Sequence, residues 1–214
     1  MIGDKLVITE YHRQGAAKVM EVLRERLRRA EGPLAVTVAG ESGSGKSEIA
    51  HCLADLVEQE GNKAVVLGQD DYFKLPPKSN HNRRLEDIGW VGPAEVKLDL
   101  LDEHLAALKA SPSEPLTKPL VFYDEDRIDS ETIQPGKLDV VIAEGTYTTL
   151  LDNADLHAFI DRDYRQTKKA RLKRARDPDV AFLEKVLAIE HAEISKHKAR
   201  AHVIIEAPPE ERQG

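Results

Sequence analysis

GESGSGKS, at residues 40–47, is the stretch that decides the fold of this 214-residue chain. It matches the phosphate-binding loop (P-loop) pattern G-x-x-x-x-G-K-[ST] at every fixed position. The glycines let the backbone wrap closely and turn its N–H groups onto phosphate oxygens. Lys46 is placed to reach the β- and γ-phosphates, and the Ser47 hydroxyl to bind Mg²⁺. We therefore expect all eight residues to bind a nucleotide: Gly40, Glu41, Ser42, Gly43, Ser44, Gly45, Lys46 and Ser47.

The sequence on both sides of this loop provides the context that the motif needs. Residues 34–39 (LAVTVA) are an apolar, β-branched run typical of a buried strand. Apolar residues between 49 and 57 then recur at helical spacing, and Gly61 ends that pattern. A strand, a glycine loop and a helix N-terminus together make an anion site that the helix dipole strengthens.

The rest of the chain alternates between strand-like and helix-like segments. Helical spacing is found at residues 13–30, from Gly92-Pro93 onwards, and at 178–199. Four more apolar runs are expected to be strands: residues 64–68, 138–144, 157–161 and 202–206. The alternation predicts a three-layer α/β fold of the P-loop type around a mostly parallel five-stranded sheet.

We expect one domain over residues 1–207, in which an N-terminal extension (1–33) precedes the core (34–206). Residues 208–214 are polar and are expected to be a disordered tail. Three further segments have weaker patterns: a short strand at 5–11, an irregular loop at 74–90, and a small hairpin that pairs 120–123 with 131–134 around an acidic turn.

The charge of the chain is unevenly distributed. The net charge of −7 argues against a general affinity for nucleic acid. Residues 162–176, however, hold eight of the 31 Lys and Arg residues and only one of the 38 Asp and Glu residues. This basic segment indicates a local anionic ligand, although a run of this kind can also be just a solvated helix face.

The cysteine and histidine content limits the possible chemistry. The single cysteine, Cys52, excludes an internal disulfide and is expected to be a small packed residue in a reducing compartment. The N-terminus lacks a signal-peptide pattern and no apolar run is long enough to span a membrane, so we expect a cytoplasmic protein without a membrane partner. The histidines have no metal-ligand spacing. We expect four of them at the surface: His51, His81, His191 and His197.

Acidic residues follow two of the expected strands. Asp70 and Asp71 come just after residues 64–68, and Glu144 ends the run LDVVIAE at 138–144. Open α/β sheets bind ligands at the carboxyl ends of their strands. A carboxylate at the end of a buried strand is costly unless it is paired or bound to a metal, so Glu144 is a candidate Mg²⁺ ligand. Asp70 and Asp71 could instead cap the turn that follows the strand.

Taken in order, these motifs resemble the uridine kinase / phosphoribulokinase family of P-loop kinases. The resemblance covers residues 34–206 and is carried by GESGSGKS, QDDYF at 69–73, Tyr123-Asp124, Ala143-Glu144-Gly145 and the Arg-rich run at 159–177. It implies an enzyme that uses ATP and Mg²⁺. It further implies that Asp70 is the general base beside the metal, with Ser47 and Glu144 as metal ligands, and that Lys46, Arg171 and Arg174 act on the phosphates, the two arginines from a helical lid at 162–178.

The acceptor side of the resemblance is less complete. Candidate substrate contacts are Phe73, Tyr123, Trp90 and Arg127. Trp90 could stack on a base or could anchor a loop against the core. The family's H-S-R after the hairpin is replaced here by Asp126-Arg127, and its ribose-binding acid by Trp90-Val91.

The sequence therefore favours a Mg²⁺-ATP-dependent kinase that phosphorylates a hydroxyl of a small molecule, such as a nucleoside. An alternative is an ATP-dependent regulatory or switch protein. A GTPase would need the guanine-reading pattern N-K-x-D, and Asn62-Lys63 is followed by Ala64-Val65. A nucleic-acid-binding module at residues 162–176 is disfavoured by the acidic remainder and the lack of interleaved aromatic residues. The oligomeric state stays open, a homo-oligomer included.

Overall fold

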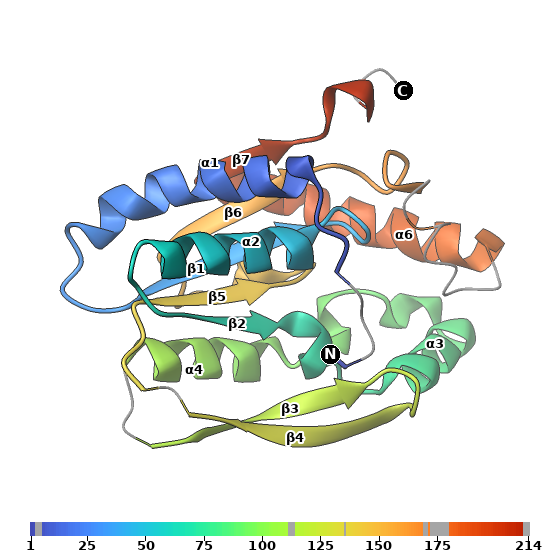
Figure 1. Cartoon of the computed structure of the whole chain (residues 1–214). Coiled ribbons are helices and arrows are strands. Elements are labelled where there is room, and N and C mark those ends of the chain that lie inside the picture. The colour runs from blue at the N-terminus through green and yellow to red at the C-terminus, as the bar shows by residue number, and fades with distance from the viewer. Residues whose placement is uncertain (3–5, 111–113, 135, 169–170, 172–179, 212–214) are drawn as a thin grey trace.

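A single parallel sheet organises the molecule. The computed structural model describes residues 1–2, 6–110, 114–134, 136–168, 171 and 180–211 (Figure 1). The five strands are arranged in the order β2 (Ala64–Gly68), β5 (Val140–Glu144), β1 (Leu34–Gly40), β6 (Leu156–Asp161) and β7 (Val203–Glu206). Every neighbouring pair is parallel. The predicted sheet is confirmed, and its carboxyl ends all lie at one edge.

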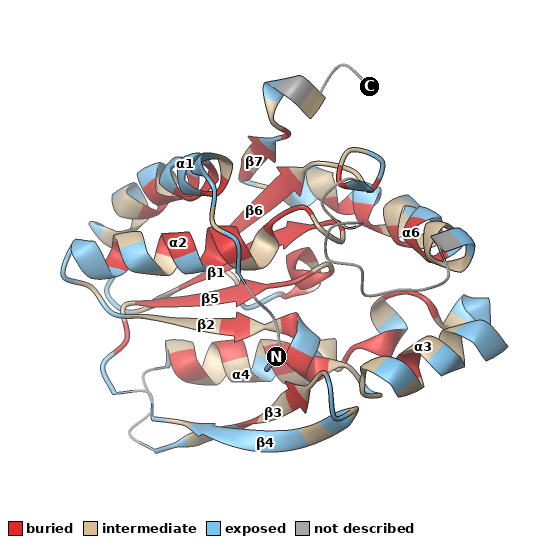
Figure 2. Ribbon diagram, turned by 45° about the vertical axis from the view of Figure 1, so that its right-hand side comes forward, coloured by how far each residue is buried: buried red, intermediate tan, exposed pale blue. Residues whose placement is uncertain are grey.

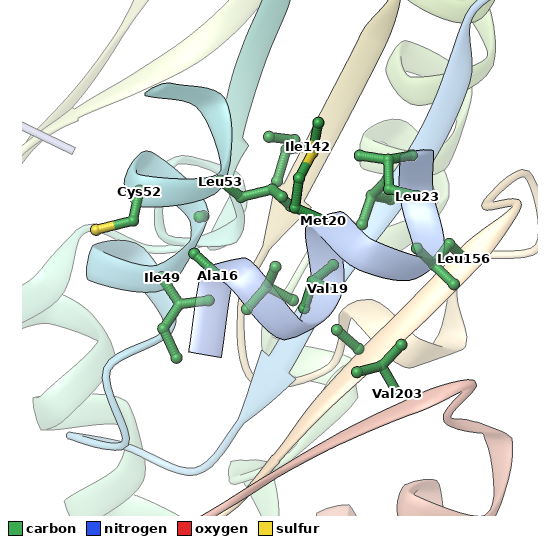
Figure 3. Packing of buried hydrophobic residues seen from close by; sticks show 14 of the residues in the cluster. Ala16, Val19, Met20, Leu23, Ile49, Cys52, Leu53, Ile142, Leu156 and Val203 are labelled. Carbon is green, nitrogen blue, oxygen red and sulfur yellow. The ribbon is translucent and has the colours of Figure 1, made fainter. Parts of the chain in front are cut away.

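Two helices cover one face of the sheet, α1 (Glu10–Leu27) and α2 (Lys46–Gln59). Their apolar stripes meet the strands in the larger core, where Met20 and Leu23 of α1 lie beside Leu53 of α2 and Ile142 of β5 (Figure 3). Strand β5 is buried throughout and β1 is buried from Ala35 onwards, as expected for a parallel sheet that is covered on both faces, and both strands contribute to that core.

The opposite face is covered by α4 (Leu98–Lys109), and α6 (Val180–Ile194) lies near the carboxyl ends of the strands. Leu101, Leu105 and Leu108 of α4 pack against Val141 of β5 in a second core. The three predicted layers are therefore present. In the part of the chain that is described, no helix has both the length and the apolar content needed to cross a membrane.

A two-stranded antiparallel sheet of β3 (Leu116–Phe122) and β4 (Arg127–Ile133) lies outside α4. The predicted pairing of residues 120–123 with 131–134 is wrong: Leu120 pairs with Asp129, and Ile133 pairs with Leu116. The hairpin is also longer than predicted, because the proline-containing stretch before residue 120 joins β3. Most of β4 faces solvent, whereas Lys118 and Val121 of β3 are buried (Figure 2). Residue Ile2 pairs through its backbone with Val121 and Tyr123 and so lies alongside β3.

Several local predictions are wrong. Residues 74–90 contain the helix α3 (Pro77–Glu86), and none of residues 6–11 forms a strand, since α1 begins at Glu10. Gly92-Pro93 opens a short 3-10 turn, and α4 begins only at Leu98. The predicted tail contains a 3-10 turn as well, and Glu211 there pairs with Arg162 at 2.6 Å. The 3-10 turns are Gln69–Tyr72, Ile88–Trp90, Pro93–Glu95, Thr148–Leu150, Ser195–Arg200 and Pro209–Glu211.

Candidate active site

The P-loop follows β1 and leads directly into α2, as its sequence predicts. Gly45 has φ = 101°, in the left-handed region that glycine tolerates, and a Cβ there would lie 2.6 Å from Nε2 of His12. His12 belongs to α1, so the N-terminal helix packs against the P-loop. Lys46 is partly exposed, and its Nζ donates to the carbonyl oxygen of Glu41 at 3.1 Å.

Glu144 and Asp70 come together because β5 and β2 are neighbours. The register pairs Gly68 with Glu144, and Asp70 follows Gly68 by two residues in the turn Gln69–Tyr72. Glu144 is buried and hydrogen-bonded to the Ser47 side chain, whereas Asp70 is exposed. Burial and then the charge of Asp70 raise the pKa of Glu144 to about 7, against the opposing effects of Lys46 and Ser47.

A cavity of about 500 Å³ opens onto these groups. Lys46, Ser47, Asp70 and Glu144 line one end, which we call the phosphate end. The other end, the acceptor end, is formed by the turn after β2, by α3, by the hairpin and by α6. The side chains lining the acceptor end include Phe73, Lys78, Asn80, His81, Arg84, Tyr123 and Glu190. The same cavity therefore extends from the phosphate-binding residues to a mixed polar and apolar lining at the acceptor end.

The oxygen groups at the phosphate end suit a magnesium ion. Mg²⁺ prefers oxygen ligands and is usually held by one or two carboxylates together with substrate phosphates. Ser47, Asp70 and Glu144 supply one hydroxyl and two carboxylates of this kind. Within the described ranges, no three His, Cys, Asp or Glu side chains gather into a metal site of their own. The residues present therefore fit a metal that arrives with a nucleotide.

Asp71 faces away from this cavity and has a structural role. It is 3% exposed, and its carboxylate accepts hydrogen bonds from Lys118 Nζ at 2.8 Å and from the backbone N–H of Val121 at 3.0 Å. The amino group of Met1 lies 3.0 Å from the same carboxylate. Asp71 therefore ties the turn after β2 to the hairpin, whereas its neighbour Asp70 faces the cavity.

The start of the basic segment lies on the P-loop. The N–H of Tyr164 donates to Glu41 Oε2 at 2.7 Å, and the Thr167 hydroxyl donates to the carbonyl oxygen of Ser42 at 3.1 Å. Arg171 is so close that a Cβ on Gly43 would lie 2.8 Å from its Cγ. Arg171 is thus beside the loop, as its predicted lid role requires, whereas Arg174 and most of the predicted lid lie outside the described residues.

Trp90 and Arg127, two of the predicted substrate contacts, do not line the cavity. The Trp90 indole N–H donates to Asn80 Oδ1 at 2.9 Å, so this side chain anchors the turn Ile88–Trp90 to α3. Arg127 is exposed and pairs with Glu125 and Asp129. Phe73 and Tyr123, in contrast, both line the acceptor end.

Asp126 has a role that sequence patterns did not indicate. Its carboxylate accepts hydrogen bonds from the backbone N–H of Lys78 at 2.6 Å and from the Ser79 hydroxyl at 2.8 Å. It therefore caps the first turn of α3 from the hairpin, where an acid also opposes the positive end of the helix dipole. This contact holds α3 and the hairpin, which both line the acceptor end, against each other.

A second cavity, of about 460 Å³, lies on the other side of Glu41. Its lining includes Asp161, Arg162, Gln166 and His191. His191 Nδ1 lies 2.6 Å from Glu41 Oε1, and burial raises the pKa of Glu41 although the His191 contact opposes the shift. The expectation that His191 and His197 are simple surface residues is therefore wrong: His191 contacts the P-loop, and His197 is buried.

We predict that Glu144→Gln stabilises the metal-free protein at pH 8. The raised pKa means that the native state holds this proton more tightly than the unfolded chain, so stability falls as the pH rises from about 4.5 to about 7. Glutamine removes that cost, which is about 1–3 kcal/mol at pH 8 and nearly absent at pH 4.

Thermal unfolding at pH 4 and pH 8 in EDTA measures this effect, with Glu206→Gln as the control because Glu206 is an exposed acid at the end of β7. A Glu144→Gln protein that is less stable than wild type at pH 8 would mean that Glu144 is ionised and well paired in the native state. The same substitution should weaken the Mg²⁺ dependence of any ATP turnover.

Comparison with known proteins agrees with this geometry. The sequence profile described as "Phosphoribulokinase / Uridine kinase family" matches residues 35–211. A uridine kinase from Ureaplasma urealyticum is 33% identical over 138 residues, which cover 62% of this chain and 64% of that protein. The bifunctional alpha-galactosidase/sucrose kinase AgaSK of Mediterraneibacter gnavus is 26% identical over 190 residues, 82% of this chain but 20% of that protein. The matched region is therefore less than two thirds of either relative.

Solved structures show the same fold. A possible uridine kinase from Bacillus stearothermophilus superposes with a TM-score of 0.64 at 19% identity, covering 88% of this chain and 97% of that one. A putative fructose transport system kinase from Silicibacter sp. TM1040 gives a TM-score of 0.62 at 22% identity, with coverage of 91% and 98%. The profile match, which spans most of the sheet and all of the motifs described above, shows that this chain belongs to the phosphoribulokinase / uridine kinase family of P-loop kinases.

Proposed function

We propose that this protein transfers the γ-phosphoryl group of ATP to a hydroxyl of a small molecule. One observation carries the proposal: Lys46, Ser47, Asp70 and Glu144 line the same cavity as the side chains of the acceptor end, among them Phe73, Asn80 and Tyr123. A phosphoryl donor and an acceptor can therefore meet in one chamber. The names of the relatives, uridine kinase and sucrose kinase, support an alcohol acceptor in general and do not agree on a single one.

Positioning does most of the chemical work in such a transfer. The P-loop N–H groups and Lys46 would hold the β- and γ-phosphates. Ser47 and Glu144, with Asp70 nearby, would hold Mg²⁺, which when bound neutralises charge on the phosphate oxygens. Asp70 is exposed to the cavity, so its carboxylate can orient the acceptor hydroxyl and take its proton as the new P–O bond forms. Glu144, which lies beside Ser47, is assigned to the metal instead.

The contacts of the basic segment suggest how the site excludes water. Tyr164, Thr167 and Arg171 already touch the P-loop, so the segment is anchored at its start. An arginine next to Gly43 can place its guanidinium against the transferred group, where charge is spread over several oxygens.

The second cavity lies between this segment and β7, and we assign it to the base and ribose of the nucleotide.

A regulatory ATP-dependent switch is the alternative, and the acceptor end of the cavity counts against it. A switch needs a nucleotide site and a segment that changes conformation, but its function does not require the cavity to extend beyond the phosphate-binding residues. The test is ADP release with Mg²⁺-ATP and a panel of acceptors that includes nucleosides, sugars, sugar alcohols and hydroxy acids. We expect one class to stimulate ADP release and to yield a product with one added phosphoryl group. ATP binding without acceptor-stimulated turnover would favour the switch.

A further inference from the structure

A buried acid occupies the second position of the P-loop. Glu41 is 6% exposed, and it lines the second cavity rather than the one that holds the phosphate end. Burial raises the pKa of this carboxyl group, although its contacts with His191 and Tyr164 oppose the shift. Phosphate binding gives no reason for an acid here, because a carboxylate repels phosphate oxygens. The side chain therefore has another role, which its contacts indicate.

Glu41 contacts two other parts of the chain, one through each carboxylate oxygen. Oε2 accepts a hydrogen bond from the N–H of Tyr164 at 2.7 Å, and Oε1 lies 2.6 Å from Nδ1 of His191 on α6. The rings of Tyr164 and His191 lie against each other, with centroids 5.6 Å apart. Glu41 therefore joins the P-loop both to the start of the basic segment and to α6.

The contact with Tyr164 continues to Arg171. The carbonyl oxygen of Tyr164 accepts hydrogen bonds from Nη2 of Arg171 at 2.5 Å and from the Thr167 hydroxyl at 3.2 Å. Nε of Arg171 donates to the same hydroxyl at 3.3 Å. These contacts use only part of the donors that a guanidinium carries, and the stem of Arg171 lies next to Gly43 of the P-loop. The position of Tyr164 therefore decides where the remaining donors of Arg171 point.

The Glu41 bond is stronger than the neutral contact beside it. The Thr167 hydroxyl donates to the carbonyl oxygen of Ser42 at 3.1 Å, but it has one proton for two acceptors, since the carbonyl oxygen of Tyr164 lies at 3.2 Å. A hydrogen bond to a carboxylate is roughly twice as strong as one between neutral groups. Glu41 therefore holds Tyr164 more firmly than Thr167 does, and Thr167 keeps the segment near the loop when Glu41 is removed.

We propose that Glu41 is a positioning residue: through Tyr164 it holds Arg171 against the γ-phosphate of the bound nucleotide. Its carboxylate acts on that phosphate without touching it, and the arginine makes the contact. His191 belongs to the same arrangement, because it holds the other carboxylate oxygen and keeps the side chain turned toward Tyr164. This inference rests on the proposed kinase function and adds a residue that serves its phosphoryl donor. A direct contact of Glu41 with the ribose or base in the second cavity is the alternative.

The test compares ADP with a non-hydrolysable ATP analogue, each titrated with Mg²⁺ in a calorimeter. The Kd for ADP divided by the Kd for the analogue measures what the γ-phosphate adds to binding, and no acceptor is needed. We expect this ratio to fall by about 10-fold in Glu41→Ala and by a similar factor in Arg171→Ala, with the ADP affinity nearly unchanged. Glu41→Gln should lose less, because its amide oxygen can still accept the N–H of Tyr164.

The double variant Glu41→Ala/Arg171→Ala distinguishes action through Arg171 from an independent effect. If Glu41 acts through the arginine, the double variant should lose no more than Arg171→Ala alone. Should Glu41→Ala not fold, the same comparison is made with Glu41→Gln. Glu58→Ala is the matched control, since Glu58 is an exposed acid near the other end of α2, outside both cavities. The control should leave both dissociation constants unchanged.

Several outcomes would overturn the inference, in variants whose thermal unfolding shows that they are folded. An equal loss of affinity for ADP and for the analogue in Glu41→Ala would place Glu41 on the ribose or base instead. Additive losses in the double variant would make the two residues independent, and an unchanged ratio in either single variant would remove that residue from γ-phosphate binding. A wild-type protein that binds neither nucleotide would overturn the proposed function itself.

Discussion

Replacing Asp70 with asparagine should lower the single-turnover rate of acceptor phosphorylation by about 10²–10⁴-fold, the range typical for loss of a general base. Asparagine keeps the shape of the side chain but cannot take the hydroxyl proton. The affinity for ATP should be nearly retained, because the P-loop backbone and Lys46 supply the phosphate contacts. The measurement is a single-turnover assay at saturating ATP, with nucleotide affinity determined alongside.

Asp71 provides the control, because it is the next residue and carries the same group. Its carboxylate is buried against Lys118 and the N–H of Val121, so Asp71→Asn breaks a buried ion pair. That should cost stability, about 3–5 kcal/mol, and affect the rate only through the folded fraction. If a folded Asp71→Asn protein lost more rate than Asp70→Asn, the base would be assigned to the wrong residue. Equal losses would indicate that the two acids act as a pair.

The sheet and the phosphate end of the site could be read from the sequence because their signals are local. Most positions in the buried strands are apolar, as expected for a parallel sheet covered on both faces, although Thr37 and His157 are also buried there. GESGSGKS predicts the loop, Glu144 ends one apolar run, and Asp70 comes two residues after another. The neighbouring positions of β2 and β5 then follow from the fold, and they bring Asp70 beside Glu144.

The acceptor end could not be predicted in the same way, because polar contacts between residues far apart in the sequence hold it together. The helix α3 has no apolar stripe; Asp126 of the hairpin caps it, and Arg84 is held by Glu95. Propensity therefore favoured a loop where tertiary contacts make a helix. The sequence does contain a signal for Glu190. It lies at helical spacing between the buried residues Leu187 and Ile194 of α6, and a carboxylate is unusual on a buried helix face.

The family resemblance was least informative at these same positions. Val91 and Asp126-Arg127 stand where the family pattern has residues that contact the nucleoside. In the structure Val91 is buried, Asp126 caps α3 and Arg127 faces solvent-exposed acids. None of the three lines the cavity. A change of residues at the acceptor end is compatible with an unchanged phosphate end, because the two ends are built from different elements.

Lys46→Met should abolish measurable turnover, a loss of at least about 10²–10³-fold, while the protein stays folded. Lys46 is partly exposed, and its ammonium group bonds only to a carbonyl oxygen of its own loop among the described contacts, so little stability depends on it. In the reaction the same charge would face the transferred phosphoryl group. Lys63→Met is the matched control, because Lys63 is exposed and lies before β2, outside the cavity.

This variant has a second readout that separates a phosphate role from a structural one. The charge of Lys46 lowers the pKa of Glu144, so removing it should raise that pKa above about 7. Protons then compete with Mg²⁺ at higher pH, and Mg²⁺-dependent binding of an ATP analogue should shift to more alkaline conditions in Lys46→Met but not in Lys63→Met. A folded Lys46→Met protein with full activity would remove the P-loop from the mechanism. One that is inactive but shows an unshifted pH profile would place the ammonium group of Lys46 away from Glu144 once the nucleotide is bound.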